Sequence, residues 1–456
     1  MKSGITRINP KAALPHSVIQ QESILLQNFI RSAAATAVVA AFASAANAGG
    51  FQLTEQSALA LGRAYAGVGV DGSDVSGVYY NPATMTLHPG TQMQLGVVGV
   101  GLNLDYVGDN GSRENGRKKP EVVPHAFVSH QLTDDAWVGF ALTVPFGLST
   151  DYSNDWDQAG DGTSAMIKVI DFNPNVAYKL SDKVSLGAGV SFQYVEAKLG
   201  FNWSQHPALG QLGPLSPGQS HLKVDGHAWG WNVGMMWTPV ETIRIGISYR
   251  SKVEHTVDGT LKTEKNILIP KVLKPTQPSD FTALPTSMNA SVTMDAPAWA
   301  MLSAAWDVND WLSLYGTFRW ADWSSFQSLT IDTAYTPFES KKNWKDTYLM
   351  TLGYDAKMSD FWTLRGGIGY ETSTISDPTL RTGTIPDADR YWLAIGSSFH
   401  WTKNFQTDVA FAHLRGVHER SVYNHKLTTN GVTTEHAGKF RKLDAYLLGV
   451  QAQYRF

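Results

Sequence analysis

The sequence predicts an all-β protein, a transmembrane antiparallel β-barrel of about 14 strands with an N-terminal plug inside its lumen. Three observations support this prediction. Apolar and polar residues alternate along many segments, charged residues make up only 17% of the chain, and aromatic residues make up 11%. Soluble domains usually carry about 25% charged residues. Barrel strands are half polar and rich in interfacial aromatics, which also fits a mean hydropathy of only −0.19.

Composition excludes several other classes of protein. The 456 residues are enough for one large barrel, the formal net charge is −3, and the chain has no Cys. No nucleic-acid partner is expected, because proteins that bind nucleic acids are strongly basic. Without Cys there can be no disulfide, thiolate nucleophile or Cys-ligated metal. The sequence predicts neither a cofactor nor a metal site.

The first 48 residues are expected to be a secretory signal peptide. Residues 32–48 are apolar or small, with residues 33–46 as their apolar part; they follow Arg31 and close with the A-x-A pattern of a cleavage site. As a helix, the apolar part would span about 21 Å, less than the hydrocarbon core of about 30 Å. The leader is either extended or has a misassigned start, and a buried soluble helix is the alternative. The mature chain is expected to begin at Gly49 or Gly50.

Period-two alternation assigns each strand face to lipid or to the lumen. In residues 184–194, Val, Leu, Ala, Phe and Tyr alternate with Ser, Gly and Gln. The pattern recurs in residues 243–250, 362–371 and 445–456. An Arg at the lipid midplane of a barrel costs about 2–4 kcal/mol, so the polar sets are expected to face the lumen. Four arginines belong to those sets: Arg244, Arg250, Arg319 and Arg365. A soluble β-sandwich is the alternative.

Connections between the expected strands are alternately short and long. Tight polar turns are expected near Thr133-Asp134, Ser181-Asp182, Asn309-Asp310, Ser359-Asp360 and Thr402-Lys403. Long connections are expected near residues 202–221, 259–285, 332–340, 376–384 and 419–437. Short periplasmic turns opposite long extracellular loops are typical of outer-membrane barrels. The barrel is therefore expected to occupy residues 91–456, with the last strand pairing with the first.

Residues 49–90 do not fit a barrel wall. They are rich in small and polar residues and lack sustained alternation, which predicts a plug, or hatch, that folds back into the lumen; a periplasmic tail is the alternative. In the third expected strand, Pro145 and Gly147 interrupt the alternation. Because Pro cannot donate to a β-ladder, they mark either a strand end at the rim or a defect in the wall. Local physics alone favours the rim.

Sequence motifs for catalysis are weak. Residues 67–72 match G-x-G-x-x-G, but they follow no strand of a βαβ unit. His418-Glu419 is not continued to a second His at the spacing of a zinc protease. No enzymatic activity is expected, and a site assembled from distant strands of the barrel is the alternative.

The chain resembles the long-chain fatty acid transporter (FadL-type) family of outer-membrane proteins, which also includes aromatic hydrocarbon transporters. The resemblance starts at GGFQLTEQSALALGRAYAG and runs in order through the mature chain. It includes the Asn81-Pro82-Ala83 triplet, PFGLSTDYSNDW, WADWSSFQ, NWKDTYLM and IPDADRYWLAIG. It implies a hatch-closed barrel in the outer membrane of a Gram-negative bacterium. The implied function is passive transport of hydrophobic compounds.

The resemblance also implies roles for particular residues. A hydrophobic molecule would bind in an apolar pocket of the lumen and leave sideways through an inward kink in the third strand. The kink would fall at Pro145, Phe146 and Gly147, which raises the wall-defect interpretation above the rim. Asn81, Pro82 and Ala83 would seat the hatch against the wall. Ligand binding would involve Phe51, Lys198, Phe201, Lys341, Lys342 and Lys345.

One departure from the family pattern concerns the ligand headgroup. Fatty-acid binders of the family carry a basic residue after the A-K stretch of the fifth strand, where this chain has Phe201. Long-chain fatty acids are the expected cargo, with aromatic or aliphatic hydrocarbons, and lastly the open channel of a general porin, as alternatives. The expected partners are a hydrophobic small molecule and outer-membrane lipid, and the chain is expected to act as a monomer.

Overall fold

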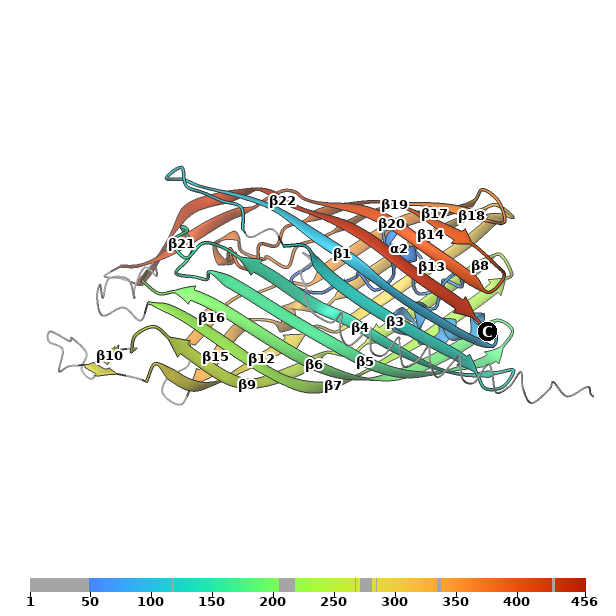
Figure 1. Ribbon diagram of the computed structural model, residues 1–456, viewed down its shortest axis with the longest axis horizontal. Coiled ribbons are helices and arrows are strands. Elements are labelled where there is room, and N and C mark those ends of the chain that lie inside the picture. Colours follow the sequence, from blue (N-terminus) through green and yellow to red (C-terminus); the bar gives the residue numbers. More distant parts are fainter. Residues whose placement is uncertain are drawn as a thin grey trace, which may run out of the picture. The chain divides into compact units, whose positions relative to one another are not determined.

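The computed structural model describes residues 49–116, 119–204, 218–266, 268–270, 281–283, 285–333, 338–428 and 431–456. The expected leader lies outside the described residues, as do parts of the long connections expected near residues 202–221, 259–285, 332–340 and 419–437. The described chain forms a closed antiparallel barrel around a short N-terminal segment (Figure 1). Among the residues described, no helix is long and apolar enough to cross a membrane.

Long strands build the wall. The first half of the chain supplies β1 (Thr91–Gly108), β3 (Glu121–Gln131), β4 (Ala136–Asp151), β5 (Ser164–Ser181), β6 (Val184–Asn202), β7 (Gln219–Val240), β8 (Ile243–Arg250) and β9 (Val253–Thr263). The second half supplies β12 (Ser287–Ala296), β13 (Trp299–Asn309), β14 (Leu312–Ala321), β15 (Ser328–Thr333), β16 (Phe338–Lys341), β17 (Thr347–Lys357), β18 (Trp362–Glu371), β19 (Arg390–His400), β20 (Phe405–Gly416), β21 (Ser421–Thr428) and β22 (Gly431–Arg455). Outside the wall, β2 (Arg113–Glu114) pairs with β1, and β10 (Leu268–Pro270) pairs with β11 (Phe281–Ala283).

Several of these segments are halves of one interrupted wall strand. Both β8 and β9 pair with β7, and they pair in turn with β13 and β12. β8 and β9 are therefore two halves of one wall strand, and so are β12 and β13. In the same way, β14 and β15, β16 and β17, and β20 and β21 are halves of single wall strands. Counted this way, the described residues form a 14-stranded barrel, as the sequence predicts. The barrel closes where β22 pairs with β1 from Gln92–Arg455 to Gly108–Gly438.

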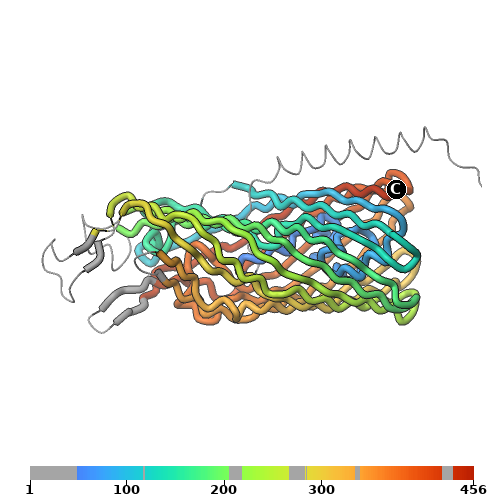
Figure 2. The backbone as a smooth tube through the Cα atoms, turned by 90° about the horizontal axis from the view of Figure 1, so that it is seen from below, coloured from blue at the N-terminus to red at the C-terminus, as the bar shows by residue number. Residues whose placement is uncertain are grey.

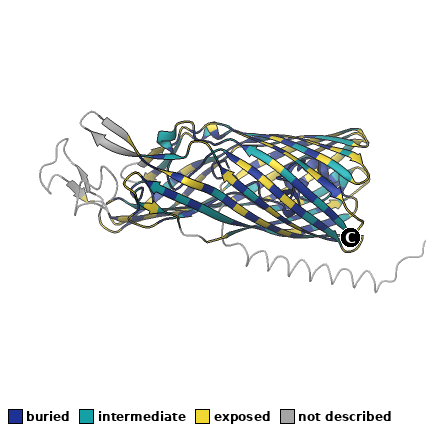
Figure 3. Ribbon diagram, turned by 90° about the horizontal axis from the view of Figure 1, so that it is seen from above, coloured by how far each residue is buried: buried dark blue, intermediate teal, exposed yellow. Residues whose placement is uncertain are grey.

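The predicted alternation of faces is confirmed along the wall (Figure 3). In β22, Leu448 is 57% exposed, whereas its neighbour Leu447 is fully buried. Tyr446, Val450, Tyr454 and Phe456 of the same set are exposed too, and they form part of the lipid-facing band. Among the arginines expected in the lumen, Arg250 and Arg365 are buried on the inner face. Each of the five predicted tight turns joins two neighbouring strands.

Residues 49–90 fold inside the barrel, as predicted, and form the plug (Figure 2). The plug contains two single-turn helices, α2 (Ala58–Leu61) and α3 (Gly77–Tyr80), and the 3-10 helix η1 (Pro82–Leu87). Ser57 caps α2 by accepting a hydrogen bond from the Ala60 amide at 3.0 Å. Two further 3-10 turns lie in wall connections, η4 (Trp323–Ser325) and η5 (Pro378–Leu380).

Candidate functional site

Five buried aromatic rings meet at the start of the plug. They are Phe51, Phe146, Trp323, Phe326 and Trp344, here called the aromatic cluster. The Phe51 ring lies at its centre, with ring centroids 4.7 Å from Trp323, 5.8 Å from Phe326, 5.9 Å from Trp344 and 6.0 Å from Phe146. Aromatic pairs at such distances each add about 0.5–1.5 kcal/mol beyond the area they bury. The cluster therefore joins the plug, the third wall strand and the interruptions of two later wall strands, between β14 and β15 and between β16 and β17, in one apolar site.

Gly50 lets the plug approach this cluster closely. Its φ of +66° lies in the left-handed region, which favours glycine. A Cβ at this position would lie 2.8 Å from the Trp344 ring and 2.9 Å from the Trp323 ring. Any side chain here would push Phe51 away from the rings that surround it.

The wall is interrupted beside the aromatic cluster, because β4 leaves β3 halfway along its length. The β3–β4 ladder ends at the pair Ala126–Leu142, and no described residue of β4 beyond that pair is matched with β3. On its other side β4 continues along β5, with an extra residue between Thr143 and Phe146. Residues 143–148 are all buried, so the alternation is lost there. Since β4 runs on to Asp151, the breakers lie within the wall and not at a strand end.

The plug occupies the place that β3 has left. We call residues 51–56 the plug strap. Gly147 N–H donates to the Phe51 carbonyl, and Leu53 N–H donates to the Pro145 carbonyl, each at 2.8 Å. The Gln56 side chain binds the Val144 backbone twice, donating to its carbonyl at 2.7 Å and accepting from its amide at 3.1 Å. The strap therefore satisfies backbone groups of the kink that a regular barrel would pair with the next strand.

The Asn81-Pro82-Ala83 triplet lies against β6 and β7, which are the second and third strands after β4 in the wall. Asn81 donates to the Met235 carbonyl of β7 at 3.0 Å. Wall glycines make the approach possible: a Cβ at Gly187 would lie 2.5 Å from the Ala83 amide, and one at Gly234 would overlap the Asn81 side chain. Contact with the wall is the geometry that the proposed seating role requires.

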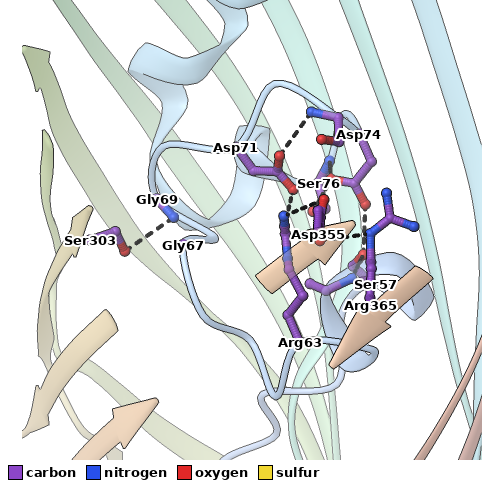
Figure 4. A network of polar contacts seen from close by, with 12 residues as sticks. Ser57, Arg63, Gly67, Gly69, Asp71, Asp74, Ser76, Ser303, Asp355 and Arg365 are labelled. Atoms are coloured by element: carbon purple, nitrogen blue, oxygen red, sulfur yellow. Dashed lines mark hydrogen bonds and ion pairs between the residues drawn. The ribbon is translucent and has the colours of Figure 1, made fainter. Parts of the chain in front are cut away.

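A buried polar network ties the middle of the plug to the later strands (Figure 4). Arg63 of the plug forms ion pairs with Asp71, also of the plug, and with Asp355 of β17, the latter at 3.1 Å. Asp355 also pairs with Arg365 of β18 at 3.1 Å. Buried charges are stable only when they are paired, so breaking one link would strongly destabilise the network. The plug is thus held by ion pairs here, whereas the hydrogen bonds between the strap and β4 are neutral. Elsewhere in the strap, the Thr54 hydroxyl accepts a hydrogen bond from Arg319 at 3.0 Å.

The basic residues expected at the ligand headgroup lie in different environments. Lys342, between β16 and β17, is buried, and it precedes Trp344 of the aromatic cluster by two residues. Burial lowers the pKa of Lys342 to about 8, although nearby Asp161 opposes this shift. Lys341 and Lys345 are exposed. Lys198 lies on the outward face of β6, where its amine pairs with Glu196 at 2.8 Å.

Phe201, which was expected at the ligand site, faces the lumen and packs against Trp203 with ring centroids 6.1 Å apart, away from the rings around Phe51.

Three residues of the aromatic cluster were not identified from the sequence. Trp323, Phe326 and Trp344 were not predicted as site residues, although WADWSSFQ and NWKDTYLM contain them. The sequence feature that could have identified them is that all three are aromatic residues just after the end of a strand segment, where a barrel usually has polar residues.

A closed barrel with a lipid-facing apolar band, a filled lumen and a buried aromatic site defines a class, the outer-membrane transporters of hydrophobic compounds. The family described as "Outer membrane protein transport protein (OMPP1/FadL/TodX)" matches residues 39–456, and the chain belongs to this family. Its members carry hydrophobic compounds across the outer membrane of Gram-negative bacteria and are not enzymes.

Two relatives and two solved structures illustrate the range of the family. The chain is 27% identical over 456 residues to the long-chain fatty acid transport protein of Escherichia coli, covering 94% of this chain and 99% of that one. It is 28% identical over 480 residues to outer membrane protein P1 of Haemophilus influenzae, covering 94% and 100%. Its fold is similar to that of a Pseudomonas aeruginosa FadL homologue, with a TM-score of 0.75, 21% identity and coverage of 89% and 100%. For the Pseudomonas putida toluene transporter TodX the TM-score is 0.66, with 17% identity and coverage of 89% and 99%.

Proposed function

We propose that this protein takes up long-chain fatty acids and binds them at the aromatic cluster. The observation that carries the proposal is that Lys342, two residues before Trp344 of the aromatic cluster, is buried. A buried ammonium is costly, and an anionic ligand headgroup would add to the partial compensation that Asp161 gives its charge. The relatives named as long-chain fatty acid transport proteins support the same cargo.

We propose lateral release at the kink of β4. Each buried CH2 of a fatty chain is stabilised by about 0.8 kcal/mol, so an exit through water is steeply uphill, whereas an exit into lipid is not. The break above the Ala126–Leu142 pair lies next to Phe146 of the aromatic cluster. Only the plug strap would have to move for a bound chain to reach it. Pro145, Phe146 and Gly147 would form the edge of the opening.

The plug would block the straight path to the periplasm. Where it packs against β13 and β14, a cavity of about 10 Å³ lined mainly by apolar residues leaves room for about one water molecule. In this proposal Asn81, Pro82 and Ala83 hold the plug to the wall while the strap moves. The β1–β22 closure leaves no free edge there, which supports action as a monomer.

Transport of aromatic hydrocarbons is the second candidate. The five rings of the aromatic cluster would suit such a ligand, and Phe201 stands where fatty-acid binders of the family carry a basic residue. A hydrocarbon gains nothing from Lys342, and this difference allows a test.

Titration calorimetry with oleate and with a C18 hydrocarbon separates the two candidates. We expect Lys342→Met to weaken oleate about tenfold or more, because a charge-assisted hydrogen bond is lost, and to leave the hydrocarbon unchanged. Lys345→Met, at an exposed position, is the matched control. Equal affinities for both ligands that do not respond to Lys342→Met would favour the hydrocarbon carrier. Liposome swelling in small sugars tests the porin alternative, since a plugged barrel would not pass them.

A further inference from the structure

The residues on the outward face of β6 indicate which part of this strand lies in the hydrocarbon layer of the membrane. From Val184 to Tyr194 every outward residue is apolar or aromatic. At about 3.3 Å per residue and a strand tilt of about 40°, this stretch spans about 25 Å across the membrane, which equals the usual apolar band of a barrel. Tyr194 and Trp229 of β7 are exposed at its extracellular edge. The hydrocarbon layer therefore ends near Tyr194.

Charged residues begin on the same outward face immediately beyond this edge. Glu196 and Lys198 are the next two outward positions of β6, about 5 and 10 Å beyond Tyr194 along the membrane normal. Lys223 of β7 lies directly opposite Lys198, and Lys168 of β5 lies directly opposite Glu196. The strands β5, β6 and β7 are neighbours in the wall (Figure 1). Three lysines are thus brought together at the height of the lipid headgroups.

One carboxylate serves two of these lysines. Glu196 is 2.8 Å from the Lys198 amine and 4.0 Å from the Lys223 amine. The two lysine side chains remain 48% and 64% exposed. Like charges directly opposite each other in a sheet are destabilising, so a further anion between Lys198 and Lys223 would be favourable.

The remaining charged groups of this face do not supply that anion. Asp225 of β7 is hydrogen-bonded to the Tyr194 hydroxyl, on the hydrocarbon side of the lysines. Asp258 and Lys262 of β9 lie one strand further on, and they add one charge of each sign. Glu264, just beyond β9, accepts a hydrogen bond from the Gln219 amide at 3.2 Å, on the extracellular side of Lys223. The pair Lys198–Lys223 therefore keeps an excess of positive charge towards the membrane.

We propose that Lys168, Lys198 and Lys223 form a binding site for the phosphate groups of the phosphorylated glycolipid of the outer leaflet. Basic clusters at headgroup height attract anionic lipids, by about a factor of five for each lysine. The acyl chains of that lipid would lie on the exposed apolar face below, which includes Val190 and Trp231. The site lies outside the lumen and is independent of the transport route. It assigns to Lys198 a lipid contact in place of a contact with the transported ligand.

Native mass spectrometry of the full mature protein in detergent tests this site. The probe is bisphosphorylated lipid A, with fully dephosphorylated lipid A as the matched ligand. We expect Lys198→Gln with Lys223→Gln to weaken binding of the phosphorylated form by about thirtyfold and to leave the dephosphorylated form unchanged. The control variant, Lys179→Gln with Lys183→Gln, removes two lysines near the opposite, periplasmic turn, and we expect it to bind like the unmodified protein.

Three results would overturn the proposal. Unchanged binding of the phosphorylated lipid by the Lys198/Lys223 variant would do so, provided that heat-dependent gel mobility shows it folded. An equal loss in the control variant would mean that net charge, and not this site, attracts the lipid. Displacement of the lipid by millimolar inorganic phosphate alone would indicate a site for the free anion instead.

Discussion

Two seams of the barrel wall differ in where their hydrogen bonds come from. The seam between β1 and β22 is paired along the whole of β1 beyond its first residue, from Gln92 to Gly108. The seam between β3 and β4 is paired only up to Ala126–Leu142, and the plug strap then supplies partners to β4. One seam is complete in itself, whereas the other depends on a segment that is not part of the wall.

This difference couples the plug to the wall. Moving residues 51–56 would leave β1 and β22 paired but would remove the partners of Val144, Pro145 and Gly147. Unpaired backbone groups are costly in lipid, so the kink is stable only with the strap in place. Opening would therefore be confined to one place in an otherwise rigid barrel.

Straightening the kink should have the largest effect. Pro145→Val with Gly147→Val would restore a backbone donor and favour regular strand, so β4 could pair with β3 along its length. We expect uptake to fall to the level of transporter-deleted cells, measured as growth on oleate as sole carbon source. Membrane insertion and oleate binding should persist.

A control for this change lies in the complete seam. Gly99→Val places a side chain on the outward face of β1, where a Cβ would meet nothing nearer than 3.7 Å. Growth on oleate should be unaffected by it. Normal uptake by the straightened variant would rule out exit at Pro145–Gly147.

Weakening the strap should have an intermediate effect. Gln56→Met keeps the length of the side chain but removes both hydrogen bonds to Val144, each worth about 1 kcal/mol. We expect hydrogen exchange in a peptide covering residues 143–148 to accelerate about tenfold or more. Gln453→Met, which removes a side-chain bond to Gln92 beside the complete seam, should leave that peptide unchanged. Equal exchange in both variants would mean that the strap does not hold the kink.

A change of pH should have the smallest effect, and it should not change the strand pairing at either seam. The Lys342 amine, with a pKa of about 8, is charged below that pH and neutral above it. A fatty acid carboxylate is ionised throughout this range. Oleate affinity should therefore fall by up to about tenfold between pH 7 and pH 9, while hydrocarbon affinity stays constant. Calorimetry at both pH values measures this, and an oleate affinity that does not change would argue against a headgroup contact at Lys342.

Alternation along the strands was enough to predict the wall. It separates Leu448 from Leu447 and assigns the lumen face to Arg365, because lipid accepts only one of the two sets. The same rule places Lys198 on the outward face of β6, four residues along the chain from the outward Tyr194. The resemblance to the family had instead implied a ligand contact for Lys198. Periodicity is therefore a better guide than motif position to the direction of a wall residue.

The partners of the kink could not be predicted in this way. Pro145 and Gly147 indicate that regular pairing fails, but nothing local identifies Phe51, Leu53 and Gln56 as replacements. Those contacts join segments about ninety residues apart and depend on how the plug packs as a whole. The aromatic cluster has the same origin, since its rings come from the plug, β4 and the interruptions of two later wall strands.

A pair of cysteines tests most directly whether the strap must leave the kink. Gln52 and Phe146 are opposed in an antiparallel bridge, where Cβ atoms lie close enough for a disulfide, and the chain has no other Cys. Gln52→Cys with Phe146→Cys should abolish oleate uptake when oxidised and regain it on reduction. Val97→Cys with Val450→Cys, opposed in the complete seam, should transport equally in both states. If the oxidised Gln52/Phe146 pair transports as fast as its reduced form, the strap does not gate a lateral exit.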